Sequence, residues 1–200
     1  MRSSCFVFAA FLSLGLCRAP AQDPERVDPD FAKKIGALLA QEAAKLKDLP
    51  LAITADPDKS MALKAGERAG LIMPDAKLTI DLLKKADTNV VPIGQFFLHG
   101  VTLMVGDKSL PAEKLRMFDT EQKKSISLLQ LGVARIGGRL VLVVYAGEKV
   151  PAIVTTLFDV EDAKDLPLEL DVRRSGESHG VVVLTVLGKY RGTFGIAPLE

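Results

Sequence analysis

Beyond Val90 the chain is dominated by apolar and β-branched residues, in short runs separated by glycine-containing or charged turns. Between residues 166 and 173, leucine and valine alternate with polar residues or proline, as expected of a strand with one face in water. The runs 140–145 and 181–184 are apolar throughout, which is typical of strands covered on both faces. The pattern predicts strands over 93–98, 101–105, 114–118, 125–136, 140–146, 152–158, 166–173, 181–187 and 192–196.

No connection between these runs is long enough to hold the helix that a parallel crossover requires. The predicted fold class is therefore mainly β, an antiparallel β-sandwich with an N-terminal α-helix, and α+β overall. Residues 49–200 are expected to form this mainly β domain. Within it, 51–54, 61–64 and 69–73 predict further short strands, and 79–86 predicts a short helix capped by Thr79.

The N-terminal helix is predicted over residues 30–48, after a polar, proline-containing leader at 22–29 that is expected to be flexible. Asp28, Pro29 and Asp30 supply a capping side chain, a first-turn proline and a negative charge at the positive end of the helix dipole. One stripe at helical spacing is apolar: Phe31, Ile35, Leu38, Leu39 and Leu46. The stripe is expected to dock on its own domain, and a groove on a partner is the alternative.

The first 21 residues have the layout of a secretory signal peptide. Arg2 precedes an apolar stretch from Phe6 to Cys17, and small residues at Ala19 and Ala21 suit a signal peptidase. We therefore expect cleavage near Ala21 and an extracytoplasmic protein, either periplasmic or secreted. Lipidation at Cys17 is a minor alternative, because the leucine before it is large for lipoprotein processing. The apolar stretch is shorter than the about 20 residues that span a bilayer, so we expect no stable membrane span.

Composition removes several function classes. The two cysteines, Cys5 and Cys17, both lie in the predicted signal peptide, so the cleaved form can contain no disulfide, thiol nucleophile or cysteine zinc site. The formal net charge is +1 for the whole chain and stays close to zero when Arg2 and Arg18 leave with the signal. A near-neutral chain without tryptophan gives no argument for nucleic-acid binding, and no cofactor is expected.

A shift of 40 positions brings out a similarity between residues 99–138 and 139–178. It places Pro111-Ala112 on Pro151-Ala152 and Phe118-Asp119 on Phe158-Asp159. A duplicated β-unit is one interpretation. Chance similarity between two strand pairs is the other.

Two groups of polar residues are candidates for chemistry. Carboxylates in predicted turns could bind calcium through their oxygens, although solvated turns are the simpler interpretation: Asp119, Glu121, Asp159, Glu161 and Asp162. His99 and His179 each precede a glycine and could begin a metal site or act as a base, whereas turn histidines bonded to backbone are the simpler interpretation. The chain contains no Gly-x-Ser-x-Gly nucleophile elbow.

These observations predict an exported, non-catalytic binding or structural module of the cell envelope, whose partner is a protein or another envelope component. One alternative is an exported hydrolase in which Asp119, Asp159, His99 or His179 share a concave pocket. The other is a calcium-dependent adhesive β-sandwich. Neither the ligand nor the oligomeric state follows from the sequence.

Overall fold

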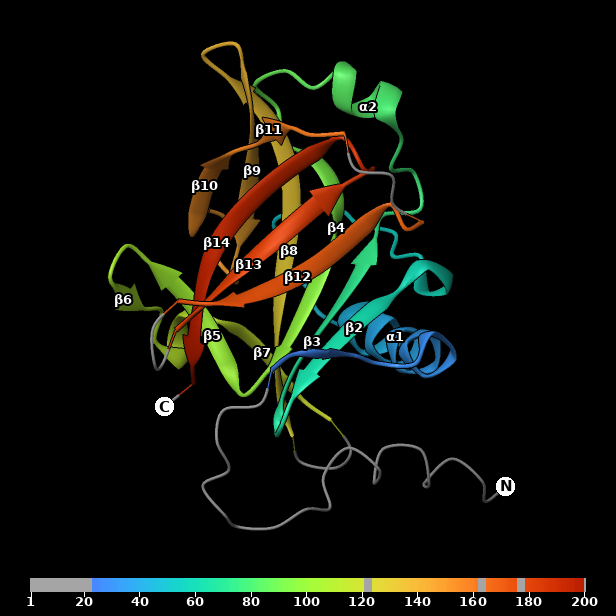
Figure 1. The fold of residues 1–200 in the computed structure, drawn as a ribbon, viewed down its shortest axis with the longest axis vertical. Helices are drawn as coiled ribbons and strands as arrows, with labels where there is room; N and C mark the ends of the chain where they lie inside the picture. The colour runs from blue at the N-terminus through green and yellow to red at the C-terminus, as the bar shows by residue number, and fades with distance from the viewer. Residues whose placement is uncertain (1–22, 121–123, 162–164, 176–178, 200) are drawn as a thin grey trace.

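The computed structural model describes residues 23–120, 124–161, 165–175 and 179–199, which form two antiparallel sheets and two α-helices (Figure 1). The first sheet has the order β1-β2-β3-β4-β8-β9-β10, with β7 also paired to β8. The second has the order β12-β13-β14-β5-β6, with β11 also paired to β14. The predicted fold class, mainly β with antiparallel sheets, is confirmed.

The bounds of the elements are as follows. The first sheet contains β1 (Glu25–Arg26), β2 (Met61–Ala65), β3 (Arg68–Pro74), β4 (Val91–His99), β7 (Arg116–Asp119), β8 (Ser125–Ile136), β9 (Arg139–Tyr145) and β10 (Ile153–Thr156). The second contains β5 (Val101–Val105), β6 (Lys108–Ser109), β11 (Phe158–Asp159), β12 (Leu168–Arg174), β13 (Gly180–Val186) and β14 (Tyr190–Pro198). The helices are α1 (Pro29–Ala43) and α2 (Ile80–Lys84), with 3₁₀ turns at Pro57–Lys59 and Ala112–Lys114.

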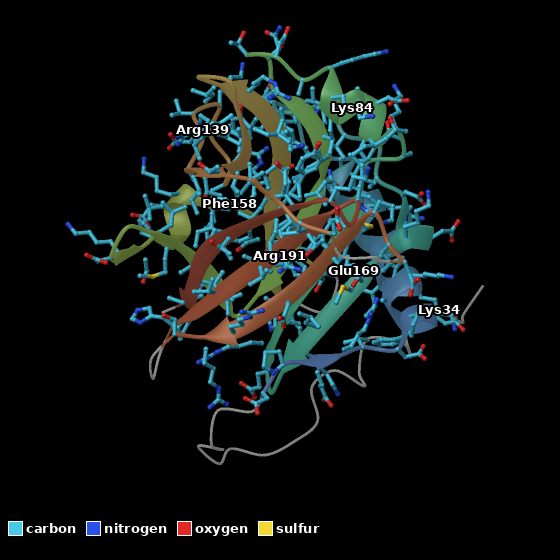
Figure 2. All side chains as sticks on the ribbon, turned by 45° about the horizontal axis from the view of Figure 1, so that its top comes forward. Lys34, Lys84, Arg139, Phe158, Glu169 and Arg191 are labelled. Atoms are coloured by element: carbon cyan, nitrogen blue, oxygen red, sulfur yellow. The ribbon has the colours of Figure 1, made fainter. Side chains whose placement is uncertain are left out.

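The main hydrophobic core lies between the two sheets. Phe96 of β4 meets Phe194 of β14 edge to face, with ring centroids 6.2 Å apart. Alternate residues of β12 and β13 join this core, including Leu170 and Leu184. The intervening residues of β12 point to the other side of the second sheet, where Glu169 shares a cross-strand row with Arg191 and Phe158 (Figure 2). The alternation predicted for this strand therefore corresponds to one core face and one polar face.

The first sheet is buried on both faces. β8 is buried at nine successive positions, from Ile126 to Ala134. On the face away from the second sheet, Ile35 and Leu39 of α1 pack on a second apolar cluster that contains Phe97. Gly36 allows this close approach, because a Cβ there would come within 2.3 Å of the Ser60 hydroxyl. Neither helix of the described ranges is long and apolar enough to cross a bilayer.

The segment after α1 covers the remainder of that outer face. Residues 51–54 belong to this segment, but they do not form the strand that was predicted there. Leu51 packs there on Val143 and Tyr145 of β9. The Gln130 side chain replaces a strand partner: its Oε1 accepts from Leu51 N–H at 2.8 Å and its Nε2 donates to the Leu51 carbonyl at 2.7 Å. Asp75 acts similarly on Thr54 of the same segment, accepting from its N–H group, and it also accepts from the Lys77 N–H group in its own turn. Side-chain bonds therefore satisfy backbone groups that a sheet would otherwise satisfy.

The N-terminal predictions need correction. Asp28 caps α1 as expected, accepting from Phe31 N–H at 3.0 Å, but the helix ends at Ala43 and not at 48. The chain tightens into i→i−3 bonds after Ala43 and reaches a left-handed φ of 59° at Asp48. Leu38 is 45% exposed, because the buried face is centred on small residues, including Ala32 and Gly36. The leader expected to be flexible contains β1, which pairs with β2.

Two further predictions concern strands. Thr79 caps α2 through a bond from Leu82 N–H, as predicted. The single strand predicted at 152–158 is instead two strands, because the chain passes at the buried Leu157 from β10 in the first sheet to β11 in the second.

The duplication of 99–138 and 139–178 stays a prediction. The segments that correspond under it lie in different sheets: β5 pairs with β14, whereas β9 pairs with β8. Similarly, β7 pairs with β8, whereas β11 pairs with β14.

Gln130 and Gln95 provide a matched test of the two hydrogen bonds that hold Leu51 on the outer face of the first sheet. The two are cross-strand neighbours, 2% and 5% exposed, but the Gln95 Oε1 has no hydrogen-bond partner among the described residues. We expect Gln130→Leu to lower the free energy of unfolding by about 2–4 kcal/mol, because it leaves the buried N–H and carbonyl groups of Leu51 without hydrogen-bond partners. Gln95→Leu should change it by less than about 1 kcal/mol or raise it. Urea unfolding measures both values, and equal losses would contradict the assigned role of Gln130.

Candidate functional site

A cleft opens between the two sheets beside the β2–β3 hairpin, and we call it the inter-sheet cleft. Its volume is about 130 Å³. Its walls are mainly apolar and come from both sheets: Leu63, Phe96 and Leu98 on one side, and Leu170, Val172 and Ile196 on the other. Pro24, just before β1, also lines it. The cleft is therefore an opening in the main core and not a surface groove between loops.

Small residues of both sheets border this opening. The core-facing row of β2 runs from Met61 through Leu63 to Ala65, so the side chains shorten toward the hairpin. Gly70 of β3 is paired with Leu63, and a Cβ on Gly70 would lie 2.9 Å from the Phe96 ring. Gly180 stands on the second sheet opposite Arg174 and Ile196 in register. The Phe96 ring packs against Gly70 and Ile196 packs against Gly180, so the unfilled space lies toward the short Ala65 side chain at the hairpin end.

The rim of the cleft is basic. Lys64, Arg68, Arg173, Arg174 and His179 all line it. Three of the cations form exposed ion pairs, Lys64 with Glu25 at 3.0 Å, Arg173 with Asp171 at 3.6 Å and Arg174 with Asp23 at 3.4 Å. The Arg68 side chain forms no ion pair or hydrogen bond with any residue that the structure describes. An apolar interior with a cationic mouth is the arrangement that suits an amphipathic anion.

A smaller cavity of about 60 Å³ lies on the opposite face of β3, under α1, and we call it the helix-side cavity. Ile35, Leu39 and Phe97 line it, with His99 and Lys124 at its polar side. Burial lowers the pKa of Lys124 from 10.5, and the charge of Glu67 opposes that shift. This volume is too small for more than a few ligand atoms.

The residues predicted for a hydrolase do not share one cavity. His99 lies at the helix-side cavity and His179 at the rim of the inter-sheet cleft. Asp119 is at the end of β7 and Asp159 is on β11, in the other sheet. Both carboxylates are exposed.

One serine, one histidine and one aspartate do come together at the start of β8. Ser125 Oγ donates to Asp119 Oδ1 at 2.6 Å, and His99 Nδ1 lies 3.2 Å from the Ser125 carbonyl oxygen. The histidine therefore contacts the serine backbone and does not stand between the hydroxyl and the carboxylate, as nucleophile activation requires. This matches the backbone-bonded turn histidine considered for His99.

The calcium candidates are only partly described. Glu121 and Asp162 lie outside the described residues, and Asp119 and Asp159 lie in different sheets. In the part of the chain that the structure describes, no three His, Cys, Asp or Glu residues are grouped closely enough to hold a metal ion. Calcium binding therefore stays a prediction for the turn around Asp159 and Glu161.

Comparison of the chain with known protein families, with characterised proteins and with solved structures finds no match. The two cavities and the groups around them are therefore the features that indicate a function. Of the residues at the mouth of the cleft, the sequence marks His179 as a candidate, but not Arg68, Arg173 or Arg174. No local pattern marks these residues, because the cleft is formed only when the two sheets pack.

The calcium alternative has a direct test. An ion bound only by the folded chain raises the melting temperature by mass action, and a chelator reverses the rise. Because the described carboxylates are exposed and dispersed, we expect 1 mM calcium, about the concentration that extracellular sites require, to leave the melting temperature unchanged. A calcium-dependent rise, lost in Asp159→Asn but kept in Asp119→Asn, would instead place a calcium site at Asp159 and its neighbours in the sequence.

Proposed function

We propose that the chain is an exported, non-catalytic binding module of the cell envelope that takes up the apolar part of a small molecule in the inter-sheet cleft. One observation carries the proposal: an opening in the main core, walled by apolar side chains from both sheets. Apolar cavities of this kind bind apolar groups, because water gains little by entering them. A protein or another envelope component as partner stays a prediction.

The size of the cleft limits what it can hold. A buried apolar cavity of about 150 Å³ accommodates benzene, so about 130 Å³ corresponds to roughly six non-hydrogen atoms. Burial of each methylene contributes about 0.8 kcal/mol, which gives about 5 kcal/mol for six of them before the cost of association is subtracted. We therefore expect a ligand that is partly buried and bound reversibly.

Two further observations support the non-catalytic and exported parts of the proposal. The candidate acids and bases of the described residues are spread over two sheets and two cavities, whereas catalysis needs them within reach of one reacting atom. The layout of the first 21 residues is that of a signal peptide.

Binding can be tested with octan-1-ol, a neutral probe, by amide NMR titration of the chain that lacks residues 1–21. We expect weak, reversible binding, with a dissociation constant of about 1 mM or above and shifts concentrated at Gly70 and Gly180. Ala65→Leu should weaken binding at least about tenfold, because the added side chain occupies the mouth of the cleft.

The matched control is Ala112→Leu, which adds the same atoms at an exposed position in a 3₁₀ turn and should bind like the unaltered protein. If octan-1-ol causes no shifts at the cleft, or binds equally well to Ala65→Leu, the proposed function is wrong.

Export can be tested separately by expressing the full chain in a bacterium. We expect the mature protein outside the cytoplasm, with Gln22 as its first residue by mass spectrometry of the N-terminal peptide. Replacing Phe11 and Leu12 by charged residues should leave the uncleaved chain in the cytoplasm. Recovery of an uncleaved chain from the cytoplasm without that change would contradict the prediction.

A further inference from the structure

We propose that the ligand of the inter-sheet cleft is a single-chain alkyl carboxylate, whose head group is held at the mouth by Arg68 and Arg174. This inference rests on the proposed binding function and specifies the chemistry of the ligand. It is carried by the position of the two arginines relative to the apolar walls.

Each arginine ends an apolar row on the inner face of its strand. Arg68 precedes Gly70 and Ile72 on the core side of β3, and Ile72 belongs to the main core. Arg174 follows Leu170 and Val172 in the same way on β12. Side chains alternate between the faces of a strand, so each guanidinium lies on the same side of its sheet as the apolar residues that line the cleft.

The two arginines also belong to different sheets and line one opening. A ligand tail between the walls would therefore place its head group between them. The planar guanidinium can bind both oxygens of a carboxylate through parallel N–H bonds, which a lysine cannot do.

The net charge at the mouth of the cleft favours a ligand head group with a single negative charge. Among the lysines and arginines of the rim, Arg68 is the one without an ion pair in the described ranges, whereas the other three each face a carboxylate. One uncompensated cation matches a monoanion better than an alkyl phosphate, which carries close to two charges at pH 7. It disfavours an alkylammonium of the same length.

The protein already places one of its own carboxylates at this mouth. Asp23 lies 3.4 Å from Arg174, and its side chain is 91% exposed. An exposed pair of this kind contributes little stability, so Arg174 can bind a ligand carboxylate while Asp23 stays near the mouth and keeps its net charge close to +1. Asp23 and Pro24 precede β1, which is held on β2 as a strand of only two residues.

The test compares the affinities of octanoate, octan-1-ol, octylammonium and octyl phosphate by NMR titration. For the unaltered chain we expect octanoate to bind about tenfold more tightly than octan-1-ol, and octylammonium and octyl phosphate to bind less tightly than octanoate. Arg68→Gln should remove most of the preference for octanoate and leave the affinity for octan-1-ol unchanged. Asp23→Asn should tighten octanoate binding several-fold, a gain that a folding defect does not produce.

Arg139→Gln is the matched control. Arg139, labelled in Figure 2, is exposed in the β8–β9 hairpin. The strand registers place it at the opposite end of the first sheet from Arg68. It should bind all four probes as the unaltered chain does. Lys124→Gln is the second control, since Lys124 lies at the helix-side cavity.

Three outcomes would overturn the assignment and leave the binding function intact. The first is equal affinity for octanoate and octan-1-ol, and the second is tighter binding of octyl phosphate than of octanoate. The third is a loss of octanoate binding in Lys124→Gln while Arg68→Gln still binds octanoate as the unaltered chain does. Failure of both octanoate and octan-1-ol to bind would instead refute the binding function itself.

Discussion

The fold depends on burial of the first sheet on both of its faces. β8 and β9 carry apolar residues at successive positions, so neither face can be left in water without a large loss of hydrophobic stabilisation. The second sheet covers one face. The other is covered by α1 and by an irregular segment, whose backbone polar groups need partners that a sheet would have supplied. The bonds made by Gln130 and Asp75 are therefore consequences of the apolar pattern of β8 and β9.

The same packing explains why a cleft can persist beside the β2–β3 hairpin. Large side chains such as Phe96, Leu129 and Phe194 set the separation of the sheets in the middle of the sandwich. Both sheets are continuous, hydrogen-bonded surfaces, so they cannot move together only at the hairpin end, where the Ala65 side chain is short. The opening thus arises because the side chains of β2 become shorter toward the hairpin, between two sheets that do not bend toward each other there.

Sequence patterns predict most of the strands, but of the polar residues at the cleft mouth they mark His179 and not the arginines, for different physical reasons. The bounds of strands 101–105 and 125–136 were predicted to the residue, because the apolar residues of a buried strand are neighbours in the sequence. The segment 51–54 looked like a strand because it is apolar, but its partners are side chains from residues far along the chain. Arg68 and Arg174 face one cleft only because β3 and β12 belong to sheets that pack against each other. No local pattern contains that information.

The position of the two arginines also bears on how the mouth stays open. If the sheets closed there, the guanidinium groups of Arg68 and Arg174 would lose water without gaining a buried counter-charge, which is costly. The acidic leader supplies only exposed, weak ion pairs, through Asp23 and Glu25. The charges that suit the proposed carboxylate head group therefore also oppose collapse of the cleft, so the same two residues would account for its accessibility and for the proposed selectivity.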